Sequence, residues 1–239
     1  MAGQRVGEVV EELRAMSDPS QLTAMARFGI RTDRALGGIG LPRLRAIGKR
    51  LGPDHDLALG LWRAGIHEAR LLAVFVDDPH EVTVEQMDAW AGDLDSWDVC
   101  DTCATNLFDR TPHAVGRLHA WADAESEFVK RAAFAMIAGL ALHERRASDA
   151  FFVAFLPLVE REAWDDRNYV RKGVNWALRQ IGKRNRTLNA EAVACAERVL
   201  AQGTRSARWI ARDAIRELSS PDMTARLNRA ESRRARARR

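Results

Sequence analysis

Trp97 and Asp101 have the types and the spacing that best suit chemistry in this chain. They lie four residues apart in the segment Asp95-Ser-Trp-Asp-Val-Cys-Asp101, so on a helix they share one face. A carboxylate beside a large aromatic ring can stabilise a developing cation or align a water molecule. The alternative interpretation, a core tryptophan with a surface aspartate, is the commoner origin of this spacing.

Trp176 lies on the polar side of a predicted amphipathic helix over residues 167–183. The apolar side of that helix is formed by Val170, Val174, Ala177, Leu178 and Ile181. Trp176 falls on the other side, among Lys172, Arg179 and Lys183. An aromatic ring on a cationic face suits nucleic acid, because basic groups meet phosphates and the ring meets a sugar or a base.

Arg131 stands in the segment 128–142, which is apolar on nearly every side. Arginine is rarely buried without a partner. Arg131 therefore either pairs with an acid inside the protein or lines a groove that faces a phosphate. The residues alone leave both alternatives open.

Other candidate motifs are weak. Cys100-Asp-Thr-Cys103 is a C-x-x-C without a βαβ context or a second pair, and the six histidines show no metal-ligand spacing. Gly37-Gly-Ile-Gly40 lacks the lysine of a phosphate-binding loop. We therefore expect no metal and no cofactor. We expect the remaining five tryptophans to lie in the core, and Trp209 is the one of them that is a candidate for a surface position.

Charge is unevenly distributed along the 239 residues, whose net charge is +4. Residues 77–101 contain nine acids and no Lys or Arg, whereas residues 205–239 contain eleven arginines against four acids. A cationic C-terminal half is typical of proteins that bind phosphate groups, although a solvated helix face would look the same. No segment approaches the run of about 20 apolar residues that spans a bilayer. Three cysteines, an odd number, favour a reducing cytoplasm.

Helix signals recur along the chain and strand signals are nearly absent, which predicts an all-α protein. From Pro112 onward, helix pairs recur at about 35–40 residues, near the period of HEAT-type repeats. We therefore expect an α-solenoid of degenerate antiparallel helix pairs with a concave basic face, and a compact helical bundle is the alternative. One domain is predicted over residues 1–220, followed by an arginine-rich, partly disordered helix or tail over 221–239. The predicted helices are 4–16, 19–28, 41–51, 54–64, 66–76, 83–92, 96–108, 112–123, 126–143, 148–162, 167–183, 188–202, 206–219 and 222–236, with Pro157 bending or ending its helix.

Three segments in order carry a family resemblance. They are Trp97-Asp-x-x-Asp101, Lys130-Arg131-Ala-Ala and Lys172-x-x-x-Trp176-x-Leu-Arg179. Together they resemble the DNA alkylation repair family, the AlkD-like HEAT-repeat DNA glycosylases, over roughly residues 5–220. The chain departs from the family where Phe28 replaces a tyrosine and where Ser96 replaces a second tryptophan.

The resemblance implies a function and assigns roles to residues. It implies a monomeric enzyme that excises N3- and N7-alkylated purines from duplex DNA without flipping the base. Asp101, Trp97 and Trp176 would be catalytic. The DNA contacts would come from Arg131, Lys172, Arg179, Lys183 and Phe28. The alternatives are a non-catalytic binder of damaged or branched DNA on the same solenoid, and a HEAT-type scaffold for a protein partner.

Overall fold

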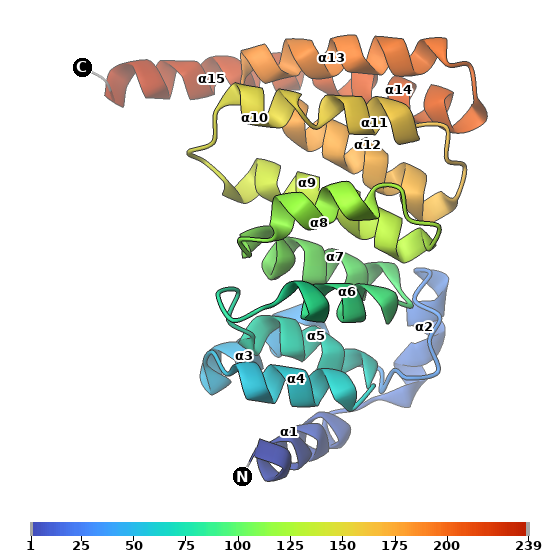
Figure 1. Ribbon diagram of the computed structural model, residues 1–239, viewed down its shortest axis with the longest axis vertical. Helices are drawn as coiled ribbons and strands as arrows, with labels where there is room; N and C mark the ends of the chain where they lie inside the picture. The colour runs from blue at the N-terminus through green and yellow to red at the C-terminus, as the bar shows by residue number, and fades with distance from the viewer. Residues whose placement is uncertain (1, 238–239) are drawn as a thin grey trace. The chain divides into compact units, whose positions relative to one another are not determined.

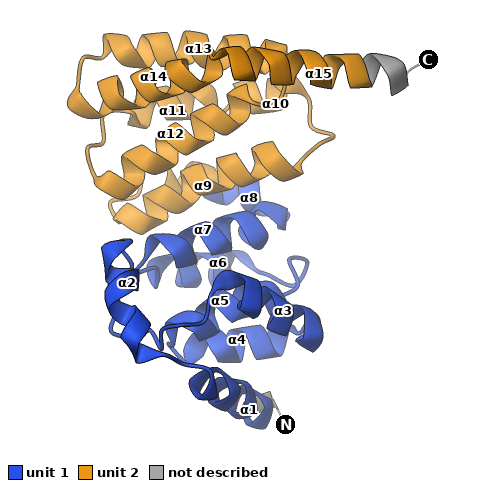
Figure 2. Cartoon of the chain, turned by 180° about the vertical axis from the view of Figure 1, so that it is seen from behind, with its two compact units in different colours: residues 1–117 blue, residues 118–239 orange. Residues whose placement is uncertain are grey.

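The computed structural model describes the backbone of residues 2–237 and the side chains of residues 3–233. Over this range the chain is helical and contains no strand, which confirms the predicted all-α class (Figure 1). The chain divides into two compact units, residues 1–117 and 118–239 (Figure 2). No helix within residues 2–237 is both long and apolar enough to cross a lipid bilayer.

Unit 1 is arranged around α5 (His67–Val76), most of whose residues are buried. This helix packs mainly against α3 (Leu41–Leu51), α4 (His55–Arg63) and α7 (Trp97–Asn106), and it also contacts α1 (Ala2–Ala15). The remaining elements of the unit are η1 (Pro19–Gln21), α2 (Leu22–Arg27), α6 (Val84–Gly92) and η2 (Phe108–Arg110). Helix α8 (Ala114–Trp121) contains the boundary to unit 2.

Local sequence signals explain where these helices begin. The side chains of Asp54 and Thr83 accept hydrogen bonds from the backbone N–H three residues on, at the starts of α4 and α6. Gly48 allows α3 to approach α5 closely, because a Cβ atom at this position would lie 2.8 Å from the Cβ atom of Phe75. The position of α5 is thus fixed by close packing on α3.

Unit 2 consists of two layers of helices (Figures 1 and 2). One layer contains α9 (Glu127–His143), α12 (Asn168–Gly182) and α14 (Arg205–Leu218). The other contains α10 (Asp149–Val153), α11 (Leu156–Glu162) and α13 (Arg186–Ala201). Helix α12 packs against α9, α11, α13 and α14, and α15 (Pro221–Ala237) follows α14 and contacts it.

Several hydrogen bonds between the helices of unit 2 join residues about one predicted repeat apart. Arg131 donates to the carbonyl oxygen of Tyr169 at 2.8 Å, and Arg179 donates to Glu217 at 2.7 Å. Each bond joins residues 38 positions apart, as does the bond from Arg198 to Glu160. The repeat of about 35–40 residues is therefore seen in hydrogen bonds between neighbouring repeats, although the residue types differ from one repeat to the next.

Two predicted helices are divided in the structure. The segment 148–162 forms α10 and α11, and Pro157 lies in the first turn of α11, where a missing N–H is tolerated. The segment 19–28 forms η1 followed by the short α2. The predicted tail is helical as far as Ala237, and residues 238–239 lie outside the described range. The single domain over residues 1–220 and the concave basic face stay predictions.

Candidate functional site

A buried histidine–aspartate pair fixes the start of α7. His67 at the start of α5 and Asp98 in the first turn of α7 are 2 % and 8 % exposed. The Nε2 atom of His67 lies 2.9 Å from Oδ2 of Asp98. Since Trp97 is the first residue of α7, this pair also determines where Trp97 lies.

The pair favours the charged forms of both side chains. Burial opposes protonation of His67, but the hydrogen bond and the negative charge of Asp98, together with those of Glu68 and Asp95, outweigh it and raise the pKa of His67. Burial likewise opposes ionisation of Asp98, but the hydrogen bond with His67 outweighs it and lowers the pKa of Asp98. The N-terminus of α7 is also a favourable place for a carboxylate.

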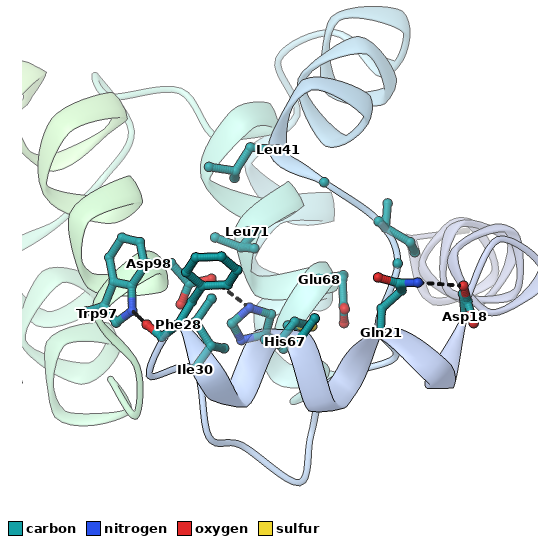
Figure 3. A pocket seen from close by; sticks show the side chains of 15 residues that line it. Asp18, Gln21, Phe28, Ile30, Leu41, His67, Glu68, Leu71, Trp97 and Asp98 are labelled. Carbon is teal, nitrogen blue, oxygen red and sulfur yellow. Dashed lines mark hydrogen bonds and ion pairs between the residues drawn. The ribbon is translucent and has the colours of Figure 1, made fainter.

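Trp97 and Asp101 are both partly exposed, one turn apart on α7, as the spacing predicts. The indole Nε1 of Trp97 donates to the carbonyl oxygen of Phe28 at 3.0 Å (Figure 3). The sequence carried no signal for this bond, because it joins residues 69 positions apart through a backbone atom. It holds the Trp97 ring against the end of α2.

A cavity of about 580 Å³ opens beside Trp97 within unit 1 (Figure 3). Phe28, whose side chain is 75 % exposed, lies at this cavity. Glu68 also lines it and accepts hydrogen bonds of 2.8 Å from the backbone N–H groups of Leu36 and Gly37. Phe28 and Trp97, proposed separately from the sequence, are thus neighbours in the structure.

Helix α12 presents Trp176 as the sequence predicted. All five residues of its predicted apolar side are buried, while Trp176 is partly exposed and Lys172 is exposed. The other two predicted cations are engaged by α14: Arg179 lies 2.7 Å and Lys183 2.5 Å from the carboxylate of Glu217. The positive charge around Trp176 is therefore partly compensated.

Arg131 is 6 % exposed, and its environment was only partly foreseen. Its Nη1 donates to the carbonyl oxygen of Tyr169, and its guanidinium lies 5.9 Å from the centre of the Tyr169 ring. The preceding residue, Lys130, has buried acidic partners of its own, which were not predicted from the sequence, with Nζ 2.8 Å from Glu162 and 3.3 Å from Asp165.

Two tryptophans outside the proposed site are exposed. Trp209 is 39 % exposed and stacks with the guanidinium of Arg171, 5.1 Å from its ring centre. Trp164 is 57 % exposed, so the expectation of a core position was wrong for this residue. The ring of Trp164 instead covers the ammonium group of Lys130, at 5.6 Å.

Comparison with known proteins assigns the family. A model of the family described as "DNA alkylation repair enzyme" matches residues 9–218. The chain belongs to this family. A solved structure from "a new family of proteins related to the HEAT-like repeat DNA glycosylases with affinity for branched DNA structures" shares the fold, with a TM-score of 0.71 and 17 % identity over 80 % of this chain and 82 % of that one. A comparison with curated proteins finds no match.

The described residues contain no group of three or more His, Cys, Asp or Glu side chains that would hold a metal ion. The cysteines of the C-x-x-C segment, Cys100 and Cys103, are both buried. Burial raises the pKa of Cys103, which opposes formation of the reactive thiolate.

Proposed function

We propose that this protein is a DNA glycosylase that removes positively charged N3- and N7-alkylpurines from duplex DNA without flipping the base. The observation that carries the proposal is the pair Trp97 and Asp101, partly exposed on one face of α7 in a chain of the DNA alkylation repair family. The third proposed catalytic residue is Trp176, partly exposed on α12.

The chemistry of the lesion suits these residue types. Alkylation at N3 or N7 gives the purine a positive charge, so the base leaves with the electron pair of the glycosidic bond and needs no general acid. The remaining sugar develops oxocarbenium character, and water then adds to its anomeric carbon and loses a proton. The carboxylate of Asp101 would stabilise the cation electrostatically, and the faces of Trp97 and Trp176 would do so through cation–π contacts.

The residues proposed to contact DNA differ in their exposure and in the bonds that they already form within the protein. Lys172 and Phe28 are exposed and can meet DNA directly. Arg131, Arg179 and Lys183 already bond to groups within unit 2. The side chains of Arg179 and Lys183 are 29 % and 14 % exposed, and an arginine has five N–H donors and a lysine three, so each of these two can keep its internal bond while donating to a phosphate.

Base release from a defined lesion tests the proposal. Wild-type protein should release N7-methylguanine from methylated duplex DNA, and Asp101→Asn should lower the rate roughly 100- to 1,000-fold, the range for removal of a preorganised electrostatic group. DNA affinity, measured by fluorescence anisotropy, should remain at the wild-type level. The control is Asp56→Asn, which removes one negative charge at an exposed position on α4. Absence of release from both N3- and N7-alkylated DNA would refute the proposal.

A second candidate function is non-catalytic binding of branched DNA. It is favoured by the similar solved structure, whose family is described as having affinity for branched DNA structures. Tight binding of a four-way junction together with no base release from any alkylated duplex would support this function over the first. A scaffold for an acidic protein would instead bind DNA weakly, without the steep salt dependence of phosphate contacts.

A further inference from the structure

A second cationic surface lies in unit 2, at the end of α12. A hollow of about 270 Å³ is lined there by Arg145, Lys183, Arg184 and Arg226, together with Ala141, Leu142 and Gln180. These residues come from α9 and the segment that follows it, from α12 and its C-terminal end, and from α15. None of the described lining residues is acidic.

Two of the four cations are held firmly by the protein. The guanidinium of Arg184 donates to the carbonyl oxygens of Ala141 and Glu144 at 2.6 and 2.9 Å, and it lies 3.8 Å from the ring centre of Phe152. Lys183 is bonded to Glu217. These contacts hold both side chains in the wall of the hollow, so that little side-chain freedom is lost on binding, although the charge of Lys183 is matched by Glu217.

The other two cations, Arg145 and Arg226, are exposed. Among the described residues, neither forms an ion pair within 4.0 Å, and both can therefore turn toward a ligand. Arginine is well suited to such a role, because its planar fork matches the oxygen atoms of a phosphate group.

Helix α15 continues this cationic surface. Arg226, Arg229 and Arg233 are exposed and follow one another at helical spacing, while Met223 and Leu227 are buried. A second hollow of about 300 Å³ along the same helix is lined by Asn228, Arg229, Ser232 and Arg233.

Helix α15 carries two acids, Asp222 in its first turn and Glu231, and the charge of Glu231 is neutralised by Arg186, whose Nε lies 2.9 Å from its carboxylate. The helix therefore presents two cationic hollows in succession with little opposing charge. A single small anion would occupy one hollow, whereas a chain of phosphates can occupy both.

We propose that this surface, defined by Arg145, Lys183, Arg184, Arg226, Arg229 and Arg233, binds the phosphodiester backbone of DNA. Its three arginines on α15, Arg226, Arg229 and Arg233, lie beyond residue 218, where the family match ends. Helix α15 thus extends the cationic surface beyond the residues that the family model matches, while Arg145, Lys183 and Arg184 lie within them. The inference rests on the proposed function only in taking DNA as the partner.

Salt-dependent DNA binding by Arg145→Ala/Arg226→Ala tests the inference. For duplex DNA, the slope of log affinity against log salt concentration is about −0.9 per phosphate contact. If wild type and variant bind equally at about 1 M salt, the loss of one contact therefore makes the variant bind about eightfold more weakly than wild type at about 0.1 M salt. Loss of two contacts should reduce the magnitude of the slope by about 2 and the affinity by up to roughly 60-fold. Both side chains are exposed, so the core stays intact.

The matched control is Arg198→Ala, which removes an exposed cation from α13, away from both hollows. It should leave the salt slope unchanged. If the double variant keeps both the affinity and the slope of the control, the surface is not a DNA site. Base release is measured separately and tests the glycosylase proposal alone. If wild-type protein releases no base, but the double variant still shows a shallower salt dependence of DNA affinity than wild type, the glycosylase proposal is overturned and the present inference is supported.

Discussion

Replacing His67 by leucine should lower the free energy of unfolding by about 3 kcal/mol, the low end of the range for breaking a buried ion pair. The substitution leaves the carboxylate of Asp98, 8 % exposed, without its imidazole partner. We take the low end because the N-terminus of α7 still favours a negative charge at this position. Urea denaturation followed by circular dichroism measures the change.

A double-mutant cycle separates the pair from general damage to the core. His67→Leu/Asp98→Leu should be at least about 1.5 kcal/mol more stable than the sum of the two single changes predicts, because no unpaired charge then remains buried. Additive effects would contradict the coupling between His67 and Asp98. His55→Leu is the control for function: it removes the histidine from a second pair, His55 and Asp77, which forms no hydrogen bond or ion pair with α7 among the described residues. At matched stability, only His67→Leu should slow base release.

The same pair predicts a pH dependence. The pKa of His67 is raised on folding, so its contribution to stability is complete below the unfolded value of about 6.5 and is lost as pH rises through the folded value. The pKa of Asp98 is lowered, so its contribution is present above about pH 4 and is lost as pH falls through the folded value. The stability difference between wild type and His67→Leu should therefore be larger at about pH 6 than at about pH 9. An equal difference at both values would contradict this reasoning.

Two further predictions concern stability. Lys130→Met should destabilise unit 2 by about 1–3 kcal/mol in urea denaturation, because it removes the ammonium group that bonds Glu162 and Asp165, while Arg161 still pairs with Glu162 and Arg167 with Asp165; a loss below about 0.5 kcal/mol would contradict this. Gly48→Ala should cost about 1–3 kcal/mol, because the new Cβ would lie 2.8 Å from the Cβ atom of Phe75. In the matched control Gly7→Ala no atom lies within 4 Å of the new Cβ, so this variant should gain about 0.5–1 kcal/mol. Thermal denaturation compares the two glycine variants, and equal effects would be inconsistent with the steric explanation.

Most of the helices were predictable because their signals are local. The apolar side of α12 and the one-turn separation of Trp97 and Asp101 on α7 follow from spacing, and the structure confirms both. The split of the segment 148–162 was foreseen as a bend or an end at Pro157, because a proline marks where a helix is interrupted without giving the length of the break.

The environment of the candidate site was much less predictable. The bond from Trp97 to the carbonyl oxygen of Phe28 and the pairing of His67 with Asp98 depend on how separate helices pack. The compensation of Arg179 and Lys183 by Glu217 requires knowledge that α14 lies beside α12. Spacing along one helix shows which residues share a face, but it does not show which partners the neighbouring helix brings to them.

The bonds between residues 38 positions apart have a consequence for how unit 2 opens. Such bonds connect a repeat mainly to its neighbours, so stability is transmitted from repeat to repeat as in a one-dimensional array. Helix α12 has neighbours on several sides, whereas α15 contacts α14 at the end of the array. Amide hydrogen exchange should therefore be slowest in α12 and fastest in α15, so that the last helix can unfold and refold while the repeats before it remain intact.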